Sequence, residues 1–219
     1  MKKTIYLALT ILLAVSCSNE DSGSDNPEQQ DTGFDFSSIL NINFDALPNY
    51  ENQPIPAYIT KDNTQGNDIT NEVATLGRIL FYDENLSINN TVSCASCHKQ
   101  ELAFGDDNSQ SIGVNGVTGR HSMRLVNSRF ANESNFFWDE RASSLEQQTT
   151  MPIKDHIEMG FSGENGDLSF DDLVSNLEST TYYPEIFEFA FGNSEISESK
   201  IQIALAHCSV PAAGRGDQG

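Results

Sequence analysis

The chain has 219 residues, with 32 acidic against 12 basic side chains, and its formal net charge at pH 7 is −20. This balance excludes nucleic acid as a partner, because phosphates are bound mainly by Lys and Arg. An acidic surface would attract a basic protein partner or simply maintain solubility.

The first sixteen residues have the pattern of an export signal. Lys2 and Lys3 give a positive start, and the apolar run that follows is too short to span a bilayer as a stable helix. Ala14-Val-Ser-Cys17 resembles the lipobox of bacterial lipoproteins. We therefore predict a lipoprotein signal peptide over residues 1–16, with Cys17 as the lipidated first residue of an exported periplasmic or cell-envelope protein. An ordinary secretory signal is the alternative.

Two segments separate this signal from the first helix. Residues 17–39 are rich in Ser, Asp, Glu, Asn, Gln and Gly. They cannot bury enough apolar surface to offset the entropy of ordering them, so we predict a disordered tether that holds the domain off a membrane. From Phe36 to Gln65 apolar residues are scattered and three prolines occur. We expect this stretch to pack along the domain as an extended arm.

Apolar spacing and capping signals predict helices joined by long loops. Val73, Leu76 and Leu80 share one face of a helix expected over 71–82. Residues 103–119 are rich in Gly, Asp, Asn and Ser and should form a loop. A capping box at Ser143–Glu146 is expected to open a second helix, which ends near Met151-Pro152. A third helix is expected to open at Ser169–Asp172. A fourth should have Pro184 as its first residue and Gly192 as its C-terminal stop, and a fifth should cover 196–206.

The stretch Cys94-Ala-Ser-Cys97-His98 has the C-x-x-C-H pattern that attaches a c-type haem. Two thiols three residues apart can each add to one vinyl group of a porphyrin, and the adjacent histidine can then offer a nitrogen to the iron. A zinc site would need two more ligands at matching spacing. A thioredoxin-like dithiol would need a βαβ setting. Neither pattern is present, so we predict haem c bound covalently through Cys94 and Cys97, with His98 on the iron.

The fold prediction follows from the same pattern. No alternating strand pattern of useful length appears in the sequence. We therefore predict that residues 40–207 form a mainly α, cytochrome c-like haem domain with long loops, in which the haem supplies much of the core.

Blocks of sequence around the haem motif resemble a known family. In chain order they are Leu76–Asp83, Ala103–Asp106, Gly119–Met123, Phe137–Ala142, Ser144–Gln148, Met151–Ile153 and Glu158–Gly160. Together they resemble the N-terminal half of bacterial di-haem cytochrome c peroxidases, over about residues 70–207. Members of that family reduce hydrogen peroxide to water with electrons from a small cytochrome c or cupredoxin, and intact members often dimerise.

The resemblance implies a role for particular residues. His98 would be the proximal ligand of the peroxidatic haem, and Trp138 matches a tryptophan that lies between two haems. Gln148 and Glu158 match distal-pocket residues, with Glu158 as the acid/base. Chemistry supports this role, because one carboxyl group in a partly apolar pocket can take a proton from peroxide and return it to the leaving oxygen. Without the block match, a surface glutamate and a core tryptophan would be the default interpretations.

Several residues stay open at this stage. His121 falls where many relatives have an asparagine that helps to bind calcium between two domains. It could instead approach the iron as a distal ligand, or be a plain loop histidine. Arg141 could pair with a haem propionate or with a nearby acid, and Phe104 could pack on the porphyrin edge or in the core.

The alternative function is a mono-haem electron-transfer cytochrome c. A Met or His that fills the sixth iron position permanently would favour it, and Met123, Met151 and Met159 are candidates. An inactive lipoprotein remnant is a third interpretation.

A complete member of the family has a second C-x-x-C-H, whereas this sequence has one. Residues 208–219 resemble nothing in the family. We therefore expect a truncated or frameshifted copy with a non-family tail, in which Cys208 is an accidental free thiol and peroxide turnover is impaired.

Overall fold

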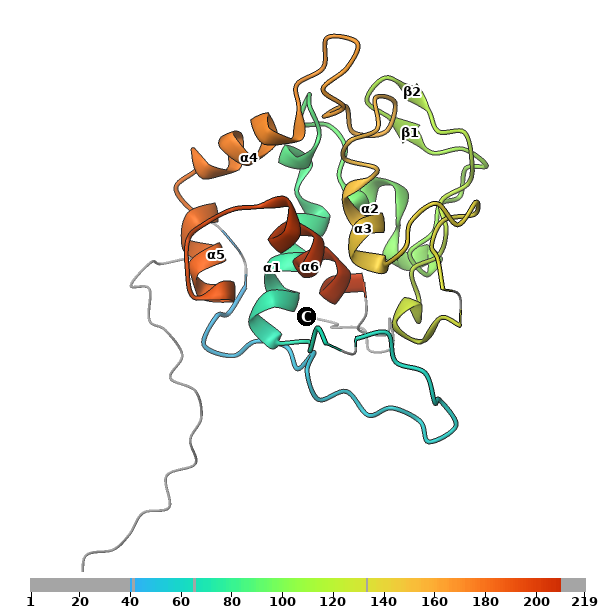
Figure 1. Cartoon of the computed structure of the whole chain (residues 1–219), viewed down its shortest axis with the longest axis vertical. Helices are drawn as coiled ribbons and strands as arrows, with labels where there is room; N and C mark the ends of the chain where they lie inside the picture. Colours follow the sequence, from blue (N-terminus) through green and yellow to red (C-terminus); the bar gives the residue numbers. More distant parts are fainter. Residues whose placement is uncertain (1–39, 41, 65, 133, 210–219) are drawn as a thin grey trace, which may run out of the picture.

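In a computed structural model of the chain, the described residues are 40, 42–64, 66–132 and 134–209 (Figure 1). The predicted signal peptide, Cys17, the tether and residues 210–219 lie outside them. The described part is mainly helical, as predicted, and its sheet is a single two-stranded hairpin. None of its helices combines the length and the apolar character needed to cross a bilayer.

The helices α1 and α6 lie side by side near the middle of the molecule, with α4 and α5 on one side and α2, α3 and the hairpin on the other (Figure 1). The elements are α1 (Asn71–Tyr82), η2 (Glu84–Leu86), α2 (Cys94–Cys97), η3 (Gln100–Leu102), β1 (Ile112–Gly113), β2 (Gly116–Val117), η4 (Ser128–Phe130), α3 (Leu145–Thr150), α4 (Phe170–Glu178), α5 (Tyr183–Phe191) and α6 (Glu198–Ser209).

Local capping sets the ends of α4 and α5. The Ser169 hydroxyl accepts the Asp172 amide at 3.3 Å, and the Asp172 carboxylate accepts the Ser169 amide at 2.8 Å, which is the predicted capping box. Gly192 ends α5 in the left-handed conformation with φ 71°, as predicted. Pro184 is the second residue of α5 instead of the first, because the helix begins at Tyr183.

Two helices differ from their predicted bounds. α3 begins one residue later than predicted. Its cap is Ser144 instead of Ser143, because the Ser144 hydroxyl accepts the Gln147 amide at 3.1 Å. α6 begins at Glu198, after Ser197, whose hydroxyl accepts the Lys200 amide at 3.5 Å. It continues to Ser209, and its residue Cys208 packs against the core.

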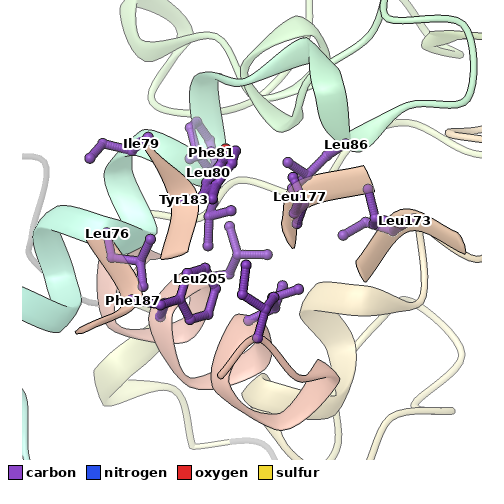
Figure 2. Packing of buried hydrophobic residues seen from close by; sticks show 14 of the residues in the cluster. Leu76, Ile79, Leu80, Phe81, Leu86, Leu173, Leu177, Tyr183, Phe187 and Leu205 are labelled. Carbon is purple, nitrogen blue, oxygen red and sulfur yellow. The ribbon is translucent and has the colours of Figure 1, made fainter. Parts of the chain in front are cut away.

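The core lies where α1, α4, α5 and α6 meet, and Figure 2 shows their apolar side chains pointing toward one another. Burying one such side chain stabilises a fold by about 1.5–3 kcal/mol, so this cluster is a major source of stability. Its large, fully buried members include Leu76 and Leu80 of α1, Leu173 and Leu177 of α4, and Tyr183 and Phe187 of α5.

The segment before α1 packs along the domain, as expected for the arm. The amides of Tyr50 and Glu51 donate to the side-chain oxygen of Asn71, at 2.7 and 3.1 Å. Farther along, Arg129 donates two hydrogen bonds to the carboxylate of Asp62. These hydrogen bonds tie the arm to the region of η4. They also lower the pKa of Asp62 to about 2.

The backbones of α1 and α6 come into contact at Gly77. A Cβ atom at this position would overlap the carbonyl of Ala204 and crowd the side chain of Cys208. Glycine is therefore required on α1 for α6 to lie this close.

We expect Gly77→Ala to lower the free energy of unfolding by about 1–3 kcal/mol, the usual cost of overpacking a core. Urea denaturation of the purified protein would measure it. Gly119→Ala is the matched control, because its Cβ would meet no atom within 4 Å. Equal stability of the two variants would contradict the close-contact account.

Candidate functional site

The C-x-x-C-H motif forms the single turn α2. The Ser93 amide donates to the Ser96 hydroxyl at 3.0 Å, and the His98 amide donates to the Cys94 carbonyl at 2.9 Å. This turn brings the side chains of Cys94, Cys97 and His98 to one cavity.

Both motif thiols lie in an environment that keeps them protonated. Burial raises the pKa of Cys94 to about 12, with a further contribution from the charge of Cys97, and burial also raises the pKa of Cys97. The two thiols line the same cavity, which is compatible with thioether attachment to one porphyrin.

The ring of His98 is bound by the backbone through Nδ1. Its Nδ1 lies 2.9 Å from the carbonyl oxygen of Phe104. A carbonyl can only accept, so Nδ1 carries the proton and Nε2 keeps its lone pair. Burial lowers the pKa of His98, although backbone hydrogen bonds with Phe104 and Met123 oppose the effect. The neutral imidazole is the form that can bind iron through Nε2.

The cavity that these residues share has a volume of about 320 Å³. Apolar side chains from helical and adjoining segments line one part of it, among them Phe81, Leu205 and Met159. Arg120 and Arg141 come from irregular segments that line another part. Apolar lining suits a flat macrocycle and the guanidinium groups suit its carboxylates, so the residues present fit a haem.

Gln148 and Glu158 lie in the same cavity, Gln148 on α3 and Glu158 on the turn after it. Burial raises the pKa of Glu158, the nearby Asp155 raises it further, and Arg141 opposes the shift. A carboxyl group with a raised pKa holds a proton closer to neutral pH than an ordinary glutamate does, which is what a general acid requires.

The β1–β2 hairpin holds the backbone of Glu158, a contact that sequence reasoning missed. The amide of Val114 donates to the Glu158 carbonyl at 3.0 Å, and the amide of Asn115 donates to the Ile157 carbonyl at 3.2 Å. Gly113 lies so close that a Cβ there would overlap the Ile157 carbonyl. The hairpin lies inside the stretch that we expected to be loop, because two-residue strands leave no alternating pattern.

Trp138 and His121 meet at the edge of the cavity. Trp138 is 61% exposed, so a plain core role is wrong, and its Nε1 donates to the His121 carbonyl at 2.9 Å. His121 is exposed, and its Nδ1 lies 2.8 Å from the Asn108 carbonyl. Among the described residues, no group of three His, Cys, Asp or Glu side chains is arranged to hold a metal ion. The iron and calcium roles of His121 both stay predictions.

Arg141 pairs with a neighbouring acid. Its Nη1 lies 2.8 Å from the Asp139 carboxylate, which also binds Arg120 at 2.9 Å. The Arg141 guanidinium lies 3.5 Å from the ring centroid of Phe137, within the range of a cation–π contact.

Four residues with undecided roles remain: Phe104 and the three methionines that could bind iron. Phe104 packs edge-on against Phe81, with ring centroids 6.0 Å apart, which favours the core role. Met123 and Met159 line the cavity, whereas Met151 is not among its lining residues.

Comparisons with known proteins agree with the resemblance. A sequence model of the di-haem cytochrome c peroxidase family matches residues 71–209. Methylamine utilization protein MauG of Methylophilus methylotrophus is 36% identical over 141 residues, which are 64% of this chain and 39% of that protein. Cytochrome c peroxidase Ccp of Escherichia coli K12 is 30% identical over 160 residues, 71% of this chain and 32% of that protein.

Solved structures agree with the fold. A MauG-like protein associated with microbial copper homeostasis matches with a TM-score of 0.64 and 32% identity, over 74% of this chain and 46% of that one. The diheme peroxidase BthA of Burkholderia thailandensis shares the fold, with a TM-score of 0.51 and 22% identity over 70% of this chain. This chain spans less than half the length of these relatives. With well over half of its residues matched by the family model, the chain belongs to the di-haem cytochrome c peroxidase family, whose cofactor is haem c.

Proposed function

We propose that this chain forms the peroxide-reducing, haem c-binding part of an exported peroxidase, anchored through a lipid on Cys17. One observation carries the proposal. Glu158 and Gln148, the two residues assigned to peroxide chemistry, line the same cavity as the haem motif. The activity of the whole relatives is carried over as part of this proposal, since the chain covers 39% and 32% of the length of the two relatives named above.

The chain's own residues handle the protons of the reaction. Bound haem would supply the iron at which two electrons cleave the O–O bond, and the whole reaction takes up two electrons and two protons to give two water molecules. The Glu158 carboxylate accepts a proton from peroxide and returns it to the leaving oxygen. We assign the Gln148 amide to orienting peroxide by hydrogen bonding, because Gln148 lines the same cavity.

Electrons would enter at the rim of the cavity. Trp138 is exposed there, and its hydrogen bond to the His121 carbonyl fixes the indole ring. We propose Trp138 as the relay from a second haem, with His121 near a calcium site completed by the rest of the protein. The net charge of −20 favours a donor cytochrome c or cupredoxin with a basic face.

A second candidate function is supported by one specific observation. Met123 and Met159 line the cavity, and Met159 is only 3% exposed. A thioether on the iron would make the protein an electron-transfer cytochrome. A methionine–iron charge-transfer band in the oxidised spectrum that peroxide does not alter would support this function over the first.

Replacing both motif cysteines, Cys94→Ala with Cys97→Ala, should abolish covalent haem attachment, because each thiol forms one thioether. The variants would be expressed with an export signal in a host that matures c-type cytochromes. The measurements are haem staining on denaturing gels and the pyridine haemochrome spectrum. Cys208→Ala is the control and should keep its haem. Wild-type protein that loses all colour on acid–acetone extraction would overturn the haem c assignment.

Glu158→Gln should slow the reaction with peroxide by about 10²–10⁴-fold, the usual contribution of a positioned acid/base. Stopped-flow mixing of haem-loaded protein with peroxide measures this step without a donor. Glu164→Gln, in an exposed turn, is the control. An unchanged rate in Glu158→Gln would remove this carboxyl group from the mechanism.

The same substitution should change stability in a pH-dependent way. The folded-state pKa of Glu158 is raised, so its contribution to stability is present at low pH and is lost as pH rises through that pKa. Glu158→Gln should therefore be more stable than wild type at pH 7–8, and the difference should vanish below the ordinary pKa of 4.5. Thermal unfolding across this pH range would test the sign, and a difference that grows on acidification would contradict it.

A further inference from the structure

The carbonyl group that binds His98 lies on an unusual turn. Ala103 and Phe104 have φ values of 57° and 56°, although neither is glycine. Residues with a Cβ seldom adopt this left-handed conformation, because the side chain crowds the following carbonyl. Two such residues in succession need surrounding contacts to hold them.

Backbone hydrogen bonds close the turn onto the residue after the iron ligand. The Lys99 amide donates to the Gly105 carbonyl at 2.8 Å, and the Phe104 amide donates to the Lys99 carbonyl at 2.9 Å. The closed turn places the Phe104 carbonyl 2.9 Å from Nδ1 of His98. The orientation of the His98 ring therefore depends on this turn, together with a backbone contact from Met123.

The side chain of Asp106, which follows the turn directly, is only 2% exposed and holds the turn in place by hydrogen bonds. Its Oδ1 accepts the Lys99 ammonium at 3.0 Å and the Asn108 amide at 3.2 Å, while Oδ2 accepts the Ser111 hydroxyl at 2.6 Å. Ser111 lies 2.9 Å from Ser122. One buried carboxylate thus joins the two ends of segment 99–111.

Asp106 is an anion at neutral pH. Burial would raise its pKa, but the hydrogen bonds from Ser111 and Lys99 outweigh burial and hold the pKa below its ordinary value. Charge-assisted hydrogen bonds of this kind are shorter and stronger than neutral ones. Asp107 also pairs with Lys99, but its side chain is 65% exposed, so water can replace that contact.

We propose that Asp106 is a positioning residue for the iron ligand, which fixes segment 99–111 so that the Phe104 carbonyl receives the Nδ1 proton of His98. The inference rests on the proposed haem function. An acceptor at Nδ1 fixes the ring and makes Nε2 a stronger donor to the metal. Loosening the turn weakens that donation and favours the reduced metal.

The test compares Asp106→Asn, Ser111→Ala and the control Asp107→Asn in haem-loaded protein. Asp106→Asn and Asp107→Asn each remove one charge beside Lys99. Ser111→Ala removes no charge, but it removes the hydroxyl's contacts with Asp106, Ser122 and Cys97. The measurements are the redox titration and the iron–histidine stretching frequency in the reduced state, by resonance Raman. The stretching frequency reports the hydrogen bond at Nδ1 directly and does not depend on peroxide activity.

For Asp106→Asn we expect a lower iron–histidine stretching frequency and a reduction potential about 59 mV higher. For a one-electron couple, this shift means about a tenfold higher ratio of reduced to oxidised protein at a fixed solution potential. Ser111→Ala should shift both measurements in the same direction by less, and Asp107→Asn should leave both unchanged.

The proposal is overturned if Asp106→Asn keeps the wild-type stretching frequency. It is also overturned if Asp107→Asn shifts both measurements as much as Asp106→Asn does. If Asp106→Asn fails to fold, Ser111→Ala decides, and wild-type values there also overturn the proposal. Wild-type protein without covalent haem would instead overturn the proposed function, so the two failures are distinguishable.

Discussion

The backbone contact between α1 and α6 at Gly77 is the constraint on which the rest of the structure depends. Both helices contribute large apolar side chains to the core, and both contribute to the cavity wall, through Phe81 and Leu205. The separation of these helices therefore sets the width of the core and the position of that wall together. Close packing of this kind leaves little freedom for compensation, because protein interiors contain few voids.

Carboxylates bind several of the cationic side chains in and near the cavity lining. Asp139 binds both Arg120 and Arg141, and Asp106 binds Lys99. Glu158 therefore faces an arginine whose charge is already shared with another carboxylate. This explains why burial and the neighbouring Asp155 outweigh Arg141 in setting the pKa of Glu158. The cavity thus contains one partly buried carboxyl group, that of Glu158, whose pKa is raised.

Much of the helical fold could be predicted because its signals are local. The apolar spacing of α1, the capping box at Ser169 and the stop at Gly192 each act within a few residues. The haem motif is local in the same sense, since Cys94, Cys97 and His98 occupy one turn. The roles of Glu158 and Trp138 could not be derived in that way, and only the resemblance singled them out. Non-local contacts were missed: the hairpin contacts Ile157 and Glu158 from more than forty positions away, and no periodic pattern records such a pairing.

The hairpin has a consequence for how the sequence can vary. Its Ile112 carbonyl lies 4.0 Å from the Cys97 sulfur, while the amides of Val114 and Asn115 hold the backbone beside Glu158. Gly113 has no room for a side chain. An insertion of one residue in the hairpin turn would shift the amides that bind the 157–158 backbone, and so would move Cys97 and Glu158 out of register with each other. Changes in chain length at 112–117 are therefore disfavoured, whereas the exposed turn at 163–166 makes none of these contacts.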